Sequence, residues 1–338
     1  MKKYISLMAI AIVAVFASCS NDDITISRGV TIKVNPAGVI SSFPEEWEGE
    51  LTTFDSSHKL RVRVLAYDQN GLLVLNESKI LPNYKTEMST SGVLAIGSYT
   101  VLAITDLYSS ESEYWKLSNE KNINTATISA EYVSLGGKNR LLGFCAQKVN
   151  ITENTQSVTI SPTPAGALLR MRYYNVLAFN DVKYFGLMTN RSSNAMSFDS
   201  NGNPNLQPYT SPDGTLDVLC SVIDVDNAEG NNLYSWYFLF PQENISFQFL
   251  WEDANEIDYD MGDRFTIPSI KAGEEWLLEV DCYTDEVAYQ KFTGAESRQL
   301  ESKTSKTVPT MIKKVEQAKI PSMFSVGKSM KLKDLIQK

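Results

Sequence analysis

The sequence is poor in the groups that catalysis uses. Its 338 residues include a single histidine, His58, so no site with two histidine ligands can form. There is no Gly-x-Ser-x-Gly element for a nucleophilic serine and no glycine-rich loop for a phosphate. His58 ends the polar segment 55–58, and we interpret it as a solvated loop residue. We therefore predict that the protein is not an enzyme and uses no cofactor and no metal ion.

The sequence also lacks an apolar run long enough to cross a bilayer, which takes roughly 20 residues. Its longest candidate, Tyr4–Ala17, follows two lysines and leads through small residues to Cys19. That order is typical of a bacterial lipoprotein signal. We predict that residues 1–18 are removed and that Cys19 is acylated, for example with palmitate, and held in outer-membrane lipid. The alternative is a plain secretory signal with Cys19 unmodified.

Positive charge is scarce outside the C-terminal segment. The mature chain of 320 residues, which is 338 less 18, has 40 acidic side chains and 29 basic ones, after the two leader lysines are removed from 31, for a net charge of −11. We therefore expect no nucleic-acid partner. Residues 290–338 hold 11 basic and 4 acidic side chains, a net of +7, so the preceding body carries −18. This basic tail is either disordered or lies on the acidic body. The acidic segment 21–23 resembles the surface-export signals of some lipoproteins and suggests surface exposure.

Cysteine is rare too. Beyond Cys19 the chain has Cys145, Cys220 and Cys282, so at least one thiol is unpaired. Cys145 and Cys220 lie in apolar, strand-like runs, where a free thiol packs as a small hydrophobic group. A Cys220–Cys282 disulfide is the alternative.

What the sequence does contain is a long series of short β segments. In the first part of the chain, 29–34 and 60–64 alternate apolar and polar residues, as half-buried strands do. Asn70-Gly71 predicts a type I′ turn that joins 60–64 to 72–75 in a hairpin. Segment 93–104 is apolar on both faces and predicts one central strand with a kink at Gly97. A short helix is possible at 109–119, and the β segments 127–133, 140–150 and 156–160 follow.

A second β series begins after 161–164. Two prolines in this tetrapeptide argue against a paired strand, so we place a domain boundary there. Six carboxylates in 252–263 indicate a charged hairpin tip; a calcium loop is the alternative. No long helices alternate with the strands, which argues against a parallel α/β sheet. The predicted class is all-β, with two tandem antiparallel β-sandwiches at 29–161 and 162–289, a lipid-linked lead-in at 19–28 and the tail at 290–338. The second-domain strands are expected at 169–173, 184–188, 216–225, 233–241, 245–251, 264–268 and 276–280.

Several short motifs carry a family resemblance. Each half has a glycine-centred turn before a strand led by an aromatic residue, and the first of these matches "aliphatic, x, small, Gly, x, Tyr, Thr". With the lipoprotein leader, the sequence resembles the fimbrillin superfamily of type V pili. The motifs are Leu94–Val101, Ile270–Leu277, Arg63–Gly71 and Tyr237–Pro241.

The resemblance implies two transthyretin-like β-sandwiches and a non-catalytic role as a fimbrial anchor or accessory subunit that joins fimbrial subunits by strand addition. In polymerising fimbrillins an arginine-directed cut in the first domain frees a groove, and Arg28 is the position here that such a cut would use. An uncut anchor suits the nearby Cys19 better. The alternative function is a surface glycan-binding lipoprotein, for which Trp47 and Trp115, both expected on loops, are the candidate glycan contacts.

Overall fold

The computed structural model describes residues 27–41, 43, 58–109, 113–130, 140–178, 182–190, 193–208, 217–224, 226, 228, 230–255 and 258–291. The predicted leader, Cys19, Trp47 and nearly all of the basic tail lie outside these residues. The described residues form strands and two short 3₁₀ segments, Pro36–Val39 and Val176–Ala178, and contain no α-helix. The predicted all-β class is confirmed. Within the same residues, no helix is long and apolar enough to pass through a bilayer.

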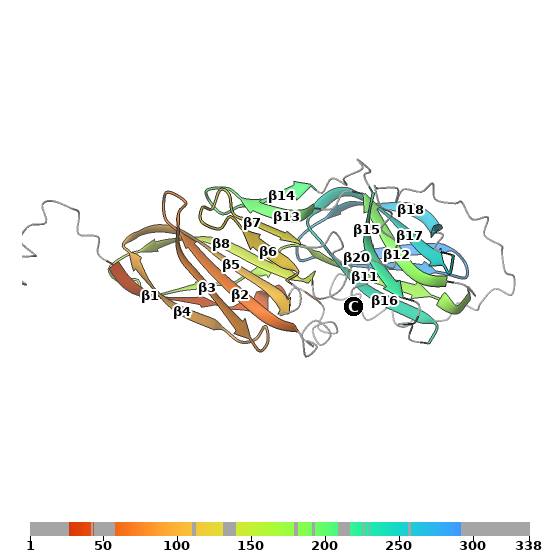
Figure 1. The fold of residues 1–338 in the computed structure, drawn as a ribbon, viewed down its shortest axis with the longest axis horizontal. Helices are drawn as coiled ribbons and strands as arrows, with labels where there is room; N and C mark the ends of the chain where they lie inside the picture. Colours follow the sequence, from red (N-terminus) through yellow and green to blue (C-terminus); the bar gives the residue numbers. More distant parts are fainter. Residues whose placement is uncertain are drawn as a thin grey trace, which may run out of the picture.

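Strands from the first half of the chain form two sheets (Figure 1). In the smaller one, β1 (Ser27–Val34) lies between β4 (Met88–Ala95), to which it is antiparallel, and β9 (Ser157–Ile160), to which it is parallel. The larger sheet is antiparallel, in the order β10-β8-β5-β2-β3. Its strands are β2 (His58–Tyr67), β3 (Leu73–Leu81), β5 (Gly97–Ser109), β8 (Leu142–Ile151) and β10 (Thr163–Pro164).

Strands from the second half also form two sheets, in the orders β16-β11-β19-β20 and β15-β12-β17-β18. The β11 and β19 pair is parallel and the other pairs are antiparallel. The bounds are β11 (Ala167–Tyr174), β12 (Val182–Asn190), β15 (Asp217–Asp224), β16 (Asn232–Leu239), β17 (Gln242–Asp253), β18 (Asp258–Ile270), β19 (Glu275–Asp281) and β20 (Glu286–Lys291).

The two halves repeat one strand order. In each, the first strand lies between the fourth and the seventh, and the second strand lies between the third and the fifth, with the sixth beyond the fifth. The seven strands are β1, β2, β3, β4, β5, β8 and β9 in the first half and β11, β12, β15, β16, β17, β18 and β19 in the second. The first strand is parallel to the seventh in both. The chain therefore contains two copies of one β-sandwich topology.

A fifth sheet joins the halves. The first half inserts a hairpin of β6 (Trp115–Ser118) and β7 (Thr127–Ala130) before its sixth strand, and the second half inserts β13 (Ser193–Phe198) and β14 (Pro204–Pro208) before its third. β7 pairs with β13, which gives the order β14-β13-β7-β6. Figure 1 shows these four strands side by side, along one side of the first-half sheets and toward the second half.

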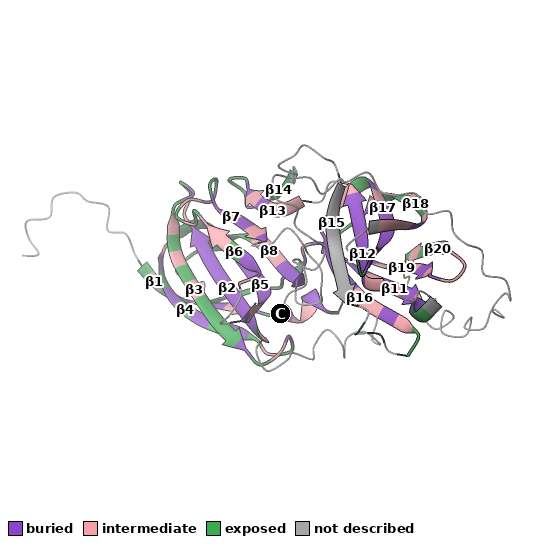
Figure 2. Ribbon diagram, turned by 45° about the vertical axis from the view of Figure 1, so that its right-hand side comes forward, coloured by how far each residue is buried: buried purple, intermediate pink, exposed green. Residues whose placement is uncertain are grey.

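The central sheet of the first half is buried on both faces. Every residue from Leu60 to Tyr67 is buried, and so is the run from Tyr99 to Leu107 (Figure 2). One face packs on the small β4-β1-β9 sheet, and the other packs on the β14-β13-β7-β6 sheet that joins the halves. The expectation that 60–64 is half buried is wrong, because Arg61 and Arg63 are enclosed as well. The run 101–107 is mostly apolar, as is typical of a strand with both faces covered. Most of the buried hydrophobic residues of both halves belong to one connected cluster.

Several local predictions need correction. The β2–β3 hairpin is confirmed, but its turn is not type I′, because only Gly71 has positive φ, at 76°, and Asn70 does not. Instead the Asp68 carboxylate accepts from the backbone N–H groups of Asn70 and Leu72, which stabilises a longer turn. The predicted strand 93–104 is two strands, because the chain passes between sheets at Ile96.

Three more segments differ from expectation. The short helix predicted at 109–119 is wrong, since β6 occupies 115–118. Thr163-Pro164 does pair, with Phe144 and Gly143, because an edge position leaves the missing proline N–H on the unpaired side. The acidic tip of the β17–β18 hairpin is partly internal, since Glu252 and Asp253 are buried. The division into separate domains stays a prediction. β20 ends at Lys291, two residues beyond residue 289, where the second domain was predicted to end.

The two glycine motifs occupy different places in the repeated topology. Gly97 begins β5, the fifth strand of the first half, whereas Gly273 precedes β19, the seventh strand of the second. The strand of the first half that matches β19 is β9. The interpretation of these motifs as paired signatures of the two halves is therefore wrong, although each does precede a strand.

Candidate functional site

The first candidate site is the N-terminal strand β1. It begins at Ser27, so Arg28 lies inside the strand, with its backbone opposite Leu94 of β4. The prediction that Arg28 precedes the first strand is wrong in this respect. Six residues of β1, Gly29–Val34, lie beyond Arg28 and stay paired with β4. A cut after Arg28 would therefore leave most of the strand in its sheet and would not free the groove.

The edge beside β1 is a second candidate. The N–H groups of Thr31 and Asn35 donate to the carbonyls of Gln156 and Ile160, at 3.0 and 2.9 Å. In a parallel ladder alternate residues face the partner, so the backbone N–H of Thr159 points away from β1. No other described strand pairs with that side of β9. In the second half, the matching side of β19 is paired with β20 along six residues.

Trp115 occupies the junction of the halves and not a loop. Its side chain is fully buried, and its indole ring makes edge contacts with Phe238 and Phe240, at centroid distances of 5.5 and 5.6 Å. The indole N–H donates to the Arg140 carbonyl at 2.9 Å. The prediction of an exposed loop tryptophan is wrong, because a buried ring with its N–H bonded cannot stack on a sugar. Trp47, the other candidate glycan contact, lies outside the described residues.

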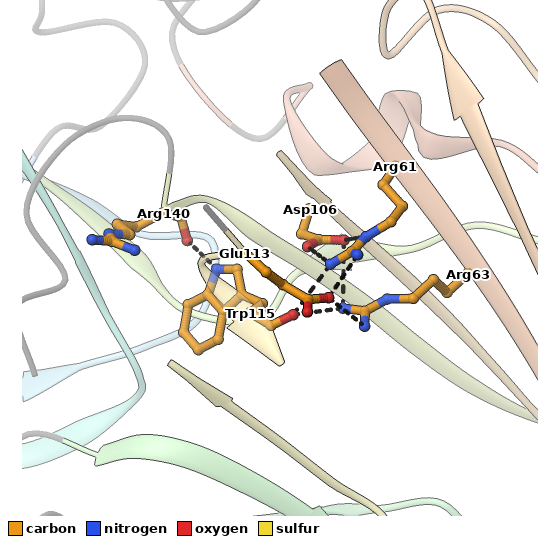
Figure 3. Close-up of polar contacts among 6 residues, drawn as sticks. All are labelled: Arg61, Arg63, Asp106, Glu113, Trp115 and Arg140. Atoms are coloured by element: carbon orange, nitrogen blue, oxygen red, sulfur yellow. Dashed lines mark hydrogen bonds and ion pairs between the residues drawn. The ribbon is translucent and has the colours of Figure 1, made fainter. Parts of the chain in front are cut away.

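Charged side chains surround the Trp115 backbone (Figure 3). Arg61 and Arg63 project from β2 on one face, and each donates to the Trp115 carbonyl at 3.2 Å. Arg61 also makes a bidentate pair with Asp106 of β5, at 2.6 and 3.1 Å, and a 2.7 Å pair with Glu113. Asp106 is fully buried, so this pair is held away from solvent.

The electrostatics of this cluster indicate a structural role. Burial lowers the pKa of Arg61, but its bonds to Asp106 and Glu113 outweigh that effect and leave the pKa raised. Burial lowers the pKa of Arg63, and the nearby Arg61 adds to this, against the opposing effect of Asp106. Arginine nonetheless stays protonated at these positions. The cluster as described thus pairs fixed charges and contains no nucleophile.

His58 is not a solvated loop residue. It is the first residue of β2 and is half buried. Its ring stacks on Tyr114 at 5.5 Å, and Nε2 lies 3.0 Å from the Tyr114 hydroxyl. The other face of this assembly holds Arg140, whose guanidinium lies 3.8 Å from the centre of the Tyr114 ring. His58 therefore helps to fix the segment that leads to Trp115.

The remaining candidate groups are buried. Cys145 is partly buried and Cys282 fully so, and both are free thiols, so the alternative Cys220–Cys282 bridge is not formed. Burial raises the pKa of both thiols, which makes them less reactive at neutral pH. Within the part of the chain that the structure describes, no group of three or more His, Cys, Asp or Glu side chains could hold a metal ion.

Glu275, at the start of β19, is an unusual buried acid. It is 3% exposed, and neither carboxyl oxygen has a hydrogen-bond partner in the described structure. It lies opposite Leu168 of β11, and Leu168 pairs on its other side with Phe238, whose ring contacts Trp115. Burial raises the pKa of Glu275 to about 8, so the carboxyl is largely protonated at neutral pH.

Sequence reasoning missed the Arg61, Arg63 and Asp106 cluster. Arg61 and Arg63 fit the polar positions of an alternating strand, which normally face water. The available signal was Asp106, a charged residue inside the apolar run 101–107. A carboxylate there needs a buried cationic partner.

Comparison with known proteins gave structural likenesses only. No family model and no curated protein matches the sequence. A candidate polysaccharide-binding protein from Bacteroides thetaiotaomicron has 9% identity and a TM-score of 0.46, with 79% of this chain and 96% of that one covered. A candidate adhesin from Bacteroides ovatus has 16% identity and a TM-score of 0.43, with 77% and 91% covered. The C-terminally truncated tip fimbrial protein Mfa3 from Porphyromonas gingivalis has 9% identity and a TM-score of 0.43, with 79% and 99% covered. Similarity at this level does not assign a family to the chain.

Proposed function

We propose that the protein is a non-catalytic fimbrial anchor or accessory subunit of the cell surface, held in the outer membrane through lipid on Cys19. It joins a partner subunit by accepting a strand at the free edge of β9. The observation that carries the proposal is the difference between the halves. The sheet of the second half continues from β19 to β20, whereas the matching sheet of the first half ends at β9 among the described strands.

Strand addition fits this edge physically. An edge strand presents unpaired backbone N–H and C=O groups, and an added strand satisfies them with main-chain hydrogen bonds. Ser157 and Thr159 of β9 are exposed, so their side chains do not block an approaching chain. Such assembly needs no catalytic residue. It also needs no cut at Arg28, which agrees with a subunit that keeps its lipid anchor.

The edge can be tested with one matched pair of substitutions. Thr159→Pro removes the backbone N–H that points away from β1, whereas Thr159→Val keeps it and changes only the side chain. We expect fimbrial subunits to co-purify from native envelopes with the parent protein and with Thr159→Val, and to be lost with Thr159→Pro. Equal recovery with both variants, when both are folded by circular dichroism, would contradict strand addition at β9.

The anchor is tested separately. Cys19→Ala should move the protein from the membrane fraction to the soluble fraction while leaving its fold unchanged. Retention of that variant in the membrane would contradict a lipid anchor at Cys19. Recovery of the parent protein with a glycan-uptake complex alone would instead favour the glycan-binding alternative.

A further inference from the structure

The central sheet of the first half is covered on its outer face by strands from both halves. The residues of this face are those that alternate with the core-facing ones: Arg61, Arg63 and Leu65 on β2, Leu102, Ile104 and Asp106 on β5, and Phe144 and Ala146 on β8. β6 and β7 supply part of the cover and belong to the first half. β13 and β14 supply the rest and belong to the second half.

The β13–β14 hairpin makes close contacts with that face. The Phe198 ring stacks on Phe144 of β8 at 5.2 Å and an angle of 23°. At the turn, a Cβ on Gly202 would lie 2.8 Å from the Ala146 Cβ and 2.9 Å from the Thr100 Cγ2. The turn backbone therefore lies directly on β5 and β8, at a position that only glycine, with φ +82°, fits.

The hairpin is also bonded into the cover. Ala195, Met196 and Ser197 of β13 pair antiparallel with Ser129, Ile128 and Thr127 of β7. Met196 and Phe198 are 1% and 4% exposed, so the hairpin has an apolar side that is buried in this arrangement. Removing it would expose both that side and the sheet beneath it.

The contact is reciprocal. While β13 and β14 reach from the second half onto the first, Trp115 reaches from the first half against Phe238 and Phe240 of the second. The direct chain connection between the two sets of sheets is short, with only Ala165 and Gly166 between β10 and β11. The halves are thus joined mainly by side chains and strand pairing of the inserted hairpins.

We propose that the β13–β14 hairpin is a clasp that holds the two halves in one orientation and makes them unfold as a single cooperative unit. Neither half can open by itself without exposing the apolar surfaces that the clasp and Trp115 cover. The repeated topology alone would give two sandwiches that unfold independently, and the clasp removes that independence. This inference does not depend on the fimbrial role.

Calorimetry of the full-length mature chain tests the clasp. We expect one transition for the parent protein, with a calorimetric to van't Hoff enthalpy ratio near 1. Phe198→Ala removes the ring on Phe144, and Gly202→Val places a branched side chain against the sheet. Each should split the transition in two and raise the ratio toward about 2. The matched control is Phe247→Ala, which removes a buried ring that stacks on Phe265 within the second half, and should lower Tm without splitting the transition.

A cross-link provides a test that does not depend on destabilisation. Ser129 and Ala195 lie opposite each other on β7 and β13, so Ser129→Cys with Ala195→Cys can form a disulfide between the halves. Added to Phe198→Ala, the oxidised pair should restore one transition, and a reductant should split it again. Two transitions in the parent protein, or a single lowered transition in Phe198→Ala equal to that of the control, would overturn the proposal.

Discussion

The two halves of the molecule share one seven-strand topology but complete it differently. Between its second and third strands, the first half has only the short turn 68–72, whereas the second half has the β13–β14 hairpin. After its seventh strand, the first half adds β10 beside β8, and the second adds β20 beside β19. The same seven-strand order is thus extended by different strands in the two halves. The first half has a central sheet covered on both faces and a smaller sheet that ends at β9 among the described strands. The second half extends the matching sheet by β20 and supplies β13 and β14 to the first half.

The halves also differ in how far their ion pairs are buried. Burial of both faces of β2 leaves Arg61 and Arg63 without water, so Asp106, Glu113 and the Trp115 carbonyl replace it. The second half has a comparable pair, Arg172 with Glu279 at 3.4 Å, on a face that keeps some exposure. In the first half, the inserted strand β6 therefore helps to enclose the charges of β2 and β5.

The largest expected loss of stability is at Trp115, which lies on β6 of the first half and contacts the second half. Trp115→Ala should lower the free energy of unfolding by about 5 kcal/mol, since a fully buried indole and its contacts with Phe238 and Phe240 are lost. Trp115→Phe keeps an aromatic ring and should cost clearly less. Urea unfolding of both variants measures this, and a loss below about 1 kcal/mol for Trp115→Ala would contradict its burial at the junction.

The second effect compares the ion pairs of the halves. Asp106→Ala leaves Arg61 and Arg63 buried without their main carboxylate and should cost about 4 kcal/mol. Glu279→Gln in the second half should cost about 1 kcal/mol, because Arg172 keeps access to solvent there. Equal losses of stability for the two variants in urea unfolding would show that burial of both faces of β2 does not strengthen the Asp106 ion pairs.

The third effect is a pH dependence of stability that arises from a residue of the second half. The seventh strand begins with exposed Ser157 in the first half and with buried Glu275 in the second. Because burial raises the pKa of Glu275 to about 8 from 4.5, the folded protein holds a proton that the unfolded chain has released between these values. The stability due to the neutral form is complete below pH 4.5 and is lost as pH rises through 8.

Between pH 5 and pH 7, this group should lower the free energy of unfolding by about 2–3 kcal/mol. Glu275→Gln removes the titration, so its Tm should fall less than that of the parent protein over this range. Thermal unfolding at both pH values provides the measurement. An identical pH dependence in the two proteins would show that Glu275 titrates normally.

The smallest expected loss of stability is in the β2–β3 turn, which occupies the position in the first half that the β13–β14 hairpin has in the second. Gly71 has φ +76° in the β2–β3 turn, and a Cβ there would lie 3.0 Å from the Ile123 Cγ2. Gly71→Ala should cost about 1 kcal/mol through backbone strain. Asn70→Ala is the control, since Asn70 does not have positive φ. A loss in chemical denaturation no larger than that of the control would argue against a strained position.

Much of the strand pattern could be predicted. The alternation in 60–64 and 169–173 placed β2 and β11, and the aromatic runs 233–241 and 245–251 placed β16 and β17. These segments have local signals, because their alternation and their β-branched and aromatic content extend over only a few residues. The 93–104 run was expected to be covered on both faces, which holds only from Tyr99 onward, since Val93 and Ile96 are exposed. The switch between sheets at Ile96 has no local signal.

The candidate site was harder to predict. Trp115 follows a polar segment and lies in a strand of only four residues, so its sequence suggested a loop. Its burial depends on Phe238 and Phe240, more than a hundred residues later, which no local pattern reveals. The start of the first strand was predicted at Gly29, two residues later than Ser27, for a similar reason, since it depends on pairing with β4.

By itself, the sequence determined the all-β class and the positions of most strands, because period-two burial and turn chemistry act over a few residues. Tertiary structure alone decided that β7 pairs with β13, that Trp115 and Asp106 are buried, and that β19 has a second neighbour, β20, where β9 has only β1 among the described strands. Those outcomes depend on which surfaces meet across long stretches of chain. Short strands with weak individual preferences take their partners from the apolar area and backbone hydrogen bonds that the whole fold satisfies together.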